Sequence, residues 1–245
     1  MSTSESLTAD LVIRGVTIPA GSTFHDAEPF GDRVFSLARA TIVHGVDVTA
    51  GSTLEVAPFP PPLSACFSLL LVPLYPWFAW HRYRNLVRPA VFAIEPADPL
   101  IVGIVEIHAG DRLWLGRDGL VDLMIRSPRI IGGHALDSGT VTFGRNGRAQ
   151  KIMLYRSQRL CDLPCFGSGL VGTEVLLDDA GRVRRCVLSE DTVFRGKSYA
   201  RGTRITFDDT GRVIATKVMA IEVALDSPRP AIMSSTASTS RAERR

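Results

Sequence analysis

The stretch Phe194-Arg-Gly-Lys-Ser-Tyr-Ala-Arg-Gly202-Thr-Arg-Ile-Thr-Phe-Asp208-Asp-Thr-Gly211-Arg-Val213 decides the fold of this 245-residue chain. After Gly202, apolar side chains alternate with polar ones, as in a strand that buries one face. The residues Asp208 to Gly211 suit a type I turn, and the glycine at its end tolerates the positive φ of a bulge. A second alternating run follows at 212–219. The stretch therefore predicts a β-hairpin.

The same pattern recurs along the chain, and its second glycine occupies positions Gly21, Gly51, Gly110, Gly139, Gly172 and Gly202. The steps between these glycines are 30, 59, 29, 33 and 30 residues. Self-similarity at a fixed period is the signature of a repeat protein. The 59-residue step equals two periods, which predicts that one unit near position 80 is missing or overwritten.

Apolar residues follow the glycine of five units at strand spacing: Leu54 and Val56, Leu113 and Leu115, Val141 and Phe143, Val175 and Leu177, Ile205 and Phe207. Turns are expected at 116–119, 144–147, 178–181 and 208–211, with second strands at 120–125, 148–154, 182–188 and 212–219. Each unit is thus expected to be a hairpin plus a short strand that ends near the Gly-x5-Gly segment.

No single hairpin can bury its own apolar face, so we expect neighbouring units to stack. The predicted fold is all-β, with repeated antiparallel hairpins of period about 30 that form an elongated β-meander or β-solenoid with an apolar insert. A compact β-sandwich whose hairpins merely look alike is the alternative.

The pattern Gly-x5-Gly-Thr-x-Val-x-Phe-x3-Gly-x-Val is clearest at 166–183 and 196–213. It resembles the repeats of bacterial MORN-like proteins, and the resemblance covers about residues 100–220 and part of 10–57. It implies a chain of hairpins in one long twisted sheet. It also implies roles in scaffolding, membrane association and partner binding rather than in catalysis.

An apolar segment lies where the missing unit is expected. No charged residue occurs from Val56 to Trp80, and the run from Leu63 to Trp80 is at the lower length limit of a membrane span. Pro73 and Pro76 interrupt any helix there. The residues predicted to meet a membrane are three apolar anchors and three arginines for lipid phosphates: Trp77, Phe78, Trp80, Arg82, Arg84 and Arg88.

Three interpretations of the insert remain open. It dips into one leaflet, or it packs as an apolar hairpin or plug against the sheet, or it spans the membrane and separates two repeat domains. The expected organisation is an N-terminal block of two units, the insert, a C-terminal block of four units and a disordered tail, at 1–57, 58–95, 96–226 and 227–245.

Charge and the first residues limit partners and location. The chain has 28 basic and 25 acidic residues, and the small excess lies in the tail, so no nucleic-acid surface is expected. The N-terminus lacks the basic and apolar regions of a secretory signal. We therefore expect a cytoplasmic protein, either free or peripheral to or anchored in a membrane, without disulfides.

Residues that could carry chemistry are few. None of the five histidines belongs to a zinc-protease motif. Cys161, Cys165 and Cys186 are the best candidate metal ligands, but a closed zinc site needs a fourth ligand. The Asp pairs at 178–179 and 208–209 are interpreted as turn residues. No catalytic residue, metal or cofactor is expected.

The sequence favours a non-enzymatic repeat scaffold or binding protein, with membrane tethering through the insert as an open option. One alternative is a small-molecule-binding or enzymatic β-barrel, in which the insert forms a lid and His25, His108 or His134 lie near the mouth. A self-assembling filament is the other. The expected partners are a protein or a membrane surface, with self-association also open.

Overall fold

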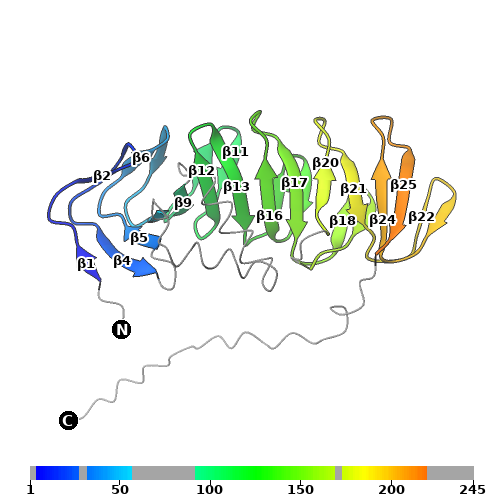
Figure 1. Cartoon of the computed structure of the whole chain (residues 1–245), viewed down its shortest axis with the longest axis horizontal. Coiled ribbons are helices and arrows are strands. Elements are labelled where there is room, and N and C mark those ends of the chain that lie inside the picture. Colours follow the sequence, from blue (N-terminus) through cyan, green and yellow to red (C-terminus); the bar gives the residue numbers. More distant parts are fainter. Residues whose placement is uncertain (1–3, 28–31, 57–91, 169–172, 220–245) are drawn as a thin grey trace, which may run out of the picture.

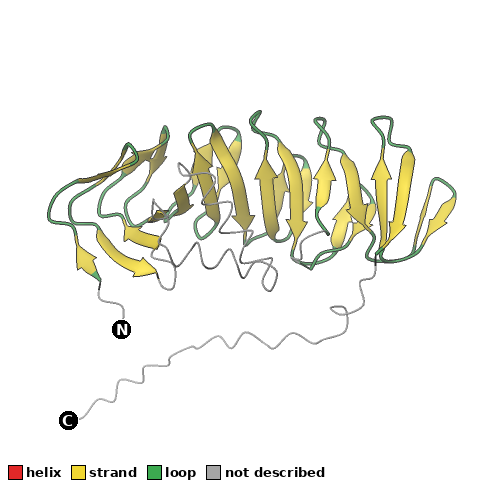
Figure 2. Ribbon diagram, viewed as in Figure 1, coloured by secondary structure: helices red, strands yellow, loops and turns green. Residues whose placement is uncertain are grey.

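The computed structural model describes residues 4–27, 32–56, 92–168 and 173–219. Every regular element in these ranges is a β-strand (Figure 2). The described part of the chain contains no helix with the length and apolar character that a membrane crossing needs. The all-β prediction is confirmed.

Thirteen strands form one antiparallel sheet in which spatial order follows chain order. These strands are β1 (Glu5–Ser6), β4 (Thr23–Ala27), β5 (Asp32–Ser36), β8 (Thr53–Val56), β9 (Phe92–Glu95), β12 (Arg112–Gly116), β13 (Gly119–Ile125), β16 (Gly139–Phe143), β17 (Ala149–Leu154), β20 (Val175–Leu177), β21 (Val183–Val187), β24 (Thr203–Phe207) and β25 (Val213–Val218). The sheet is an open, elongated meander with β1 and β25 at its edges, and it does not close into a barrel (Figure 1).

Six two-stranded hairpins form a second layer over one face of this sheet. They are β2 (Leu11–Ile13) with β3 (Val16–Ile18), β6 (Thr41–Val43) with β7 (Val46–Val48), β10 (Leu100–Val102) with β11 (Val105–Ile107), β14 (Arg129–Ile131) with β15 (His134–Leu136), β18 (Gln158–Leu160) with β19 (Leu163–Cys165), and β22 (Thr192–Phe194) with β23 (Lys197–Tyr199). Each hairpin connects two neighbouring strands of the sheet, so a unit contributes two sheet strands and one hairpin.

The prediction of a single short strand near each Gly-x5-Gly segment is therefore wrong, because a complete two-stranded hairpin lies there. The turn residues explain the difference. Arg14 and Gly15 both have positive φ, at 52° and 83°, and Arg195 and Gly196 repeat this at 50° and 78°. Two consecutive positive φ values define the type I′ turn that joins strands across two residues. In five of the six hairpins a two-residue turn with at least one glycine stands between two three-residue runs, and this pattern is the sequence signal.

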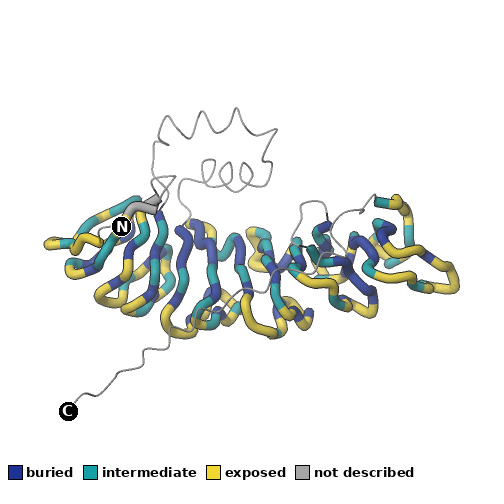
Figure 3. The backbone as a smooth tube through the Cα atoms, turned by 90° about the horizontal axis from the view of Figure 1, so that it is seen from below, coloured by how far each residue is buried: buried dark blue, intermediate teal, exposed yellow. Residues whose placement is uncertain are grey.

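The core lies between the two layers. All ten apolar residues predicted to face inward are buried. Strand register aligns them in one row across the sheet, in which Leu54 pairs with Ile94, Ile94 with Leu113, and Leu113 with Leu123. Figure 3 shows buried residues along the inside of the stack and exposed residues at its outer bends. Stacking of units thus buries the faces that single hairpins leave open.

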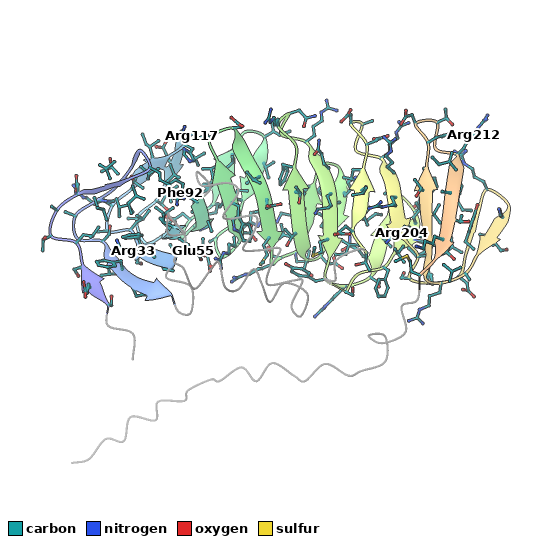
Figure 4. All side chains as sticks on the ribbon, viewed as in Figure 1. Arg33, Glu55, Phe92, Arg117, Arg204 and Arg212 are labelled. Atoms are coloured by element: carbon teal, nitrogen blue, oxygen red, sulfur yellow. The ribbon has the colours of Figure 1, made fainter. Side chains whose placement is uncertain are left out.

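The tight turns of the sheet follow the predicted chemistry. In the turn at 208–211, Asp208 Oδ1 accepts the backbone N–H groups of Thr210 and Arg212, and Gly211 has φ of 74°. The hydroxyl of Thr210, followed by the Arg212 N–H, lowers the pKa of Asp208. At Asp178 burial opposes ionisation, but hydrogen bonds from Arg182 outweigh it, so this pKa is lowered too. Figure 4 shows Arg117 and Arg212 at the end of the sheet that carries such turns.

A buried polar residue after the unit glycine fixes the opposite end of the strands. Ser22 Oγ accepts the N–H of Ala38 at 3.1 Å, and Ser52 Oγ accepts the N–H of Ala97 at 3.0 Å. In the next unit, Asp111 takes the same place. The bond from Ala97 to Ser52 joins residues on either side of the apolar insert, so the repeat continues across it.

The insert takes the place of a turn in the sheet. Strand β8 pairs directly with β9, with Leu54 opposite Ile94, so no gap exists in the sheet where a unit would be missing. The expectation that a unit near position 80 is missing or overwritten therefore stays a prediction, because the direct pairing of β8 with β9 leaves no visible gap in the sheet. Residues 57–91 connect two adjacent strands, in the place where other units have a short turn. The connection is longer by about one period, which explains the 59-residue step between glycines.

This connectivity bears on the three interpretations of the insert. Strands before and after it belong to one sheet, and β9 begins at Phe92, inside the range expected for the insert. One sheet cannot have its strands on opposite sides of a membrane. The spanning interpretation, with two separate repeat domains, is therefore excluded, while the one-leaflet and packed interpretations stay open.

Candidate functional site

The outer face of the hairpin layer carries a row of exposed aliphatic side chains. The second residue of five hairpins is β-branched and apolar, and it is between 62 % and 74 % exposed. We call these residues the outer row: Val12, Ile42, Ile101, Ile130 and Val193. In the hairpin of β18 and β19 the same place holds Arg159. Single exposed aliphatic residues are ordinary, but one per unit at one position is a periodic surface.

Polar residues lie beside the outer row. Register places Thr17 opposite Val12, Asp47 opposite Ile42, Glu106 opposite Ile101, Ala135 opposite Ile130 and Ser198 opposite Val193. Two of the five neighbours are therefore acidic, and Asp47 is exposed, as is the side chain of Glu106 at 70 %. Aliphatic and acidic side chains thus lie side by side in the middle of the hairpin layer.

Hydrogen bonds between successive hairpins hold this surface in order. Thr41 Oγ1 donates to the backbone carbonyl of Thr17 at 2.5 Å, and Gln158 Nε2 donates to that of Ala135 at 2.8 Å. In both cases the first residue of one hairpin reaches the seventh residue of the hairpin before it. These bonds fix the first hairpin to the second and the fourth to the fifth, which helps to order the outer row.

A buried ion pair supports the centre of the outer row. Arg129, the first residue of β14 and the neighbour of Ile130, pairs with Asp111, and their side chains are 8 % and 1 % exposed. Asp111 also accepts the N–H of His108 at 2.9 Å and that of Arg126 at 3.2 Å. A buried carboxylate of this kind is tolerated because every contact satisfies part of its charge.

The histidines that the sequence offers as candidates lie in different places in the structure. His25 is exposed on β4, and the ring of His44 packs edge-on against Phe92, with centroids 5.3 Å apart. His108 lies 3.7 Å from Glu106 at the surface. These rings do not converge on one site. His134 is the exception, because it is buried and faces Cys161, with Nδ1 3.9 Å from Sγ.

The three cysteines named as candidate metal ligands have different environments. Cys165 and Cys186 are buried, and contact with Cys186, followed by burial, raises the pKa of Cys165 far above its usual range. Cys161 is exposed. Within residues 4–27, 32–56, 92–168 and 173–219, no three His, Cys, Asp or Glu side chains are grouped so that they could hold a metal ion.

The residues predicted to meet a membrane lie outside the described residues, as does the tail. These are Trp77, Phe78, Trp80, Arg82, Arg84 and Arg88.

Comparison of the chain with protein-family models, with curated proteins and with solved structures found no match in any of the three. Function is therefore inferred from the residues themselves.

Two features of the surface escape sequence reasoning, and each has a signal. Sequence reasoning does not identify the outer row because Ile42 and Ile101 stand in runs of strand-forming residues, Thr41-Ile-Val and Leu100-Ile-Val. Nothing in such a run marks the middle residue as exposed. The contact of Cys161 with His134 joins two hairpins. Their separation of 27 residues is close to one period, which places both residues in neighbouring units.

Proposed function

We propose that this chain is a non-enzymatic repeat scaffold that binds an amphipathic helix of a protein partner along the outer row. The observation that carries the proposal is the recurrence of an exposed aliphatic residue at one position of five hairpins. A periodic surface of this kind suits a partner with the same period. Extended repeat surfaces are a common means of partner binding.

The spacing of the outer row supports a helical partner. Each unit contributes two strands to the sheet, and strands lie about 4.8 Å apart, so successive aliphatic residues are about 10 Å apart. Seven residues of an α-helix advance about 10.5 Å. An extended strand fits less well, because its side chains on one face recur about every 6.7 Å. A helix with apolar residues at heptad spacing therefore matches the row.

The charges beside the row support a protein rather than a lipid surface. Asp47 and Glu106 flank Ile42 and Ile101. They would be repelled by anionic lipid headgroups, whereas lysine or arginine beside the apolar stripe of a helix would complement them. The expected partner is thus an amphipathic helix with basic residues next to its apolar positions.

The first prediction concerns affinity along the outer row. A synthetic helical peptide with leucine at every seventh position and lysine at the flanks is expected to bind the full chain. The triple variant Ile42→Ser, Ile101→Ser, Ile130→Ser should weaken binding about 100-fold, because each buried aliphatic side chain contributes roughly 1 kcal/mol. Fluorescence anisotropy of the labelled peptide measures the dissociation constant.

A matched control is available on the same molecule. Ile214 and Val218 are also exposed aliphatic residues, at 61 % and 73 %, but they lie on edge strand β25. The double variant Ile214→Ser, Val218→Ser should leave peptide affinity unchanged. Equal losses in the two variants would mean that exposed apolar area alone binds the peptide. No binding by the unaltered chain would refute the helix proposal.

We propose further that the insert tethers this scaffold to a membrane from one side. One support is the apolar run from Leu63 to Trp80. The other is the pairing of β8 with β9, which means that the insert leaves the sheet and returns to it at two adjacent strands. Aromatic and arginine side chains next to an apolar run are typical of a membrane interface.

The second prediction tests the tether. The double variant Trp77→Ser, Trp80→Ser is expected to move the protein from the membrane fraction to the supernatant, because both indole rings would lose their place at the lipid interface. Fractionation followed by a carbonate wash measures the shift. The outer-row triple variant is the control and should stay with the membrane. Retention of the tryptophan variant on membranes would contradict the tether.

A further inference from the structure

We propose that Cys161 is a reactive thiol, activated by His134, that forms mixed disulfides with low-molecular-weight disulfides. Such a modification site is independent of peptide binding along the outer row. It stands at one end of the hairpin layer, where the turn between β18 and β19 meets the strand β15 of the preceding hairpin and a tight turn of the sheet.

The thiol is presented to solvent by its turn. Cys161 is exposed and occupies the first turn position with φ of 48°, and Asp162 follows with φ of 65°. Each of the other five hairpins has at least one glycine at its two turn positions, as at Arg14-Gly15 and Arg195-Gly196. Here two residues that carry side chains adopt positive φ, and one of them, Cys161, has a nucleophilic thiol.

The histidine is oriented as a base. His134 is 6 % exposed, and its Nε2 lies 2.6 Å from the backbone carbonyl oxygen of Gly181. A carbonyl oxygen only accepts hydrogen bonds, so Nε2 carries the proton in the neutral ring. The lone pair of Nδ1 is therefore available to the Cys161 thiol, at 3.9 Å from Sγ. Nucleophile, base and orienting group stand in the order that activated thiols require.

The reaction balances without any group beyond the disulfide. The thiol proton of Cys161 passes to His134 Nδ1, and the thiolate attacks one sulfur of the small disulfide. A new S–S bond forms to Cys161 and the S–S bond of the small molecule breaks. The leaving thiolate takes the proton back from Nδ1, so Cys161 is oxidised to a mixed disulfide while the leaving half is reduced to a thiol.

Charged residues belong to, or bond to, the two turns that hold the pair. Asp162 follows Cys161 in the turn, and Arg159 of β18 donates to the Asp162 carbonyl at 2.8 Å. Asp178 and Arg182, which are bonded to each other, flank the Gly181 carbonyl, and Arg148 reaches the carbonyl of Asp179. Among the described residues, the side chain that contacts the Cys161 thiol through a hydrogen bond is that of His134, so His134 is placed to accept its proton.

The other cysteines provide internal controls. Cys165 and Cys186 are buried in the core, and the Cys165 thiol has a raised pKa, so both are expected to be inert in the folded chain. Cys66 belongs to the insert and lies outside the described residues. Measurements therefore use the full chain with Cys66→Ser as the parent protein.

The test is the rate of mixed-disulfide formation with two probes, dithiobis-nitrobenzoate and glutathione disulfide. The folded parent should react at one thiol, and Cys161→Ser should abolish this reaction while Cys165→Ser leaves it unchanged. His134→Gln should slow the reaction about tenfold at about pH 7, where a free imidazole is mostly neutral while an unassisted thiol is still almost fully protonated. The loss should shrink as the pH rises toward about 9, which a merely structural role of His134 would not produce.

Three results would overturn the proposal. One is an equal rate in the parent and in folded His134→Gln, with folding checked by far-ultraviolet circular dichroism. Another is a reaction that survives in Cys161→Ser. The third needs no histidine variant: the parent is compared in buffer and in concentrated urea at about pH 7, and a rate per exposed thiol that is no higher in the folded state shows that the fold does not activate Cys161.

Discussion

Replacement of Asp111 by alanine is expected to lower the free energy of unfolding by about 3–5 kcal/mol, the loss typical when one partner of a buried ion pair is removed. The guanidinium of Arg129, 8 % exposed, would remain buried without its counter-charge. The backbone N–H groups of His108 and Arg126 would lose their acceptor at the same time. Urea denaturation followed by circular dichroism measures the change.

The matched control is an ion pair in solvent. Arg159 and Glu190 lie 3.1 Å apart with side chains 63 % and 59 % exposed. Glu190→Ala should cost less than about 1 kcal/mol, because water screens this pair and hydrates each group alone. Similar losses at Asp111 and Glu190 would show that burial of the first pair has no energetic consequence, and Asp111 would then not anchor the hairpin layer.

Replacement of Leu123 by alanine is expected to cost about 2–5 kcal/mol, the range for large-to-small changes in a packed core. Leu123 is fully buried on β13 in the middle of the sheet, with Leu113 on one side and Val141 on the other. In a repeat array, each unit contacts mainly its neighbours. The cavity should therefore weaken the link between the two halves, and hydrogen exchange should show them opening separately.

The control for Leu123 is an aliphatic residue of a neighbouring hairpin that faces outward. Ile130→Ala removes as many carbon atoms as Leu123→Ala, but from a side chain that is 74 % exposed, and it should change stability by no more than about 0.5 kcal/mol. A Leu123→Ala loss as small as that would contradict the placement of the core. Uniform weakening of all amides would contradict the unit-by-unit description.

The fold can be predicted from the sequence because local and periodic signals agree. The alternation around Leu113 and Ile205 predicts burial correctly, and the Asp208 turn predicts both the hairpin and its bulge. The layer of short hairpins escapes prediction because their three-residue strands are too short for alternation to identify. The insert resembles a lost unit because its extra length is close to one period.

The candidate sites are less accessible to sequence reasoning for a physical reason. An isoleucine such as Ile101 is a residue type typical of a core. Only the structure, in which Ile101 lies opposite the acidic Glu106, shows that it faces solvent. The pairing of Cys161 with His134 depends on how two neighbouring hairpins abut, which no local pattern encodes. Sequence periodicity defines units well, but it does not define which side chains of adjacent units converge.

The position of residues 57–91 between adjacent strands has a consequence for how this architecture can change. Entry and exit of the segment are separated by a single strand spacing, about 4.8 Å, and Leu54 stays opposite Ile94. Any tight turn at that end of the sheet, such as the one at 208–211, could accept a graft whose two ends meet at this spacing, with a closure cost that grows slowly with its length. The array is thus modular in two directions: it lengthens by whole units, and it gains accessory parts at its turns without a shift in register.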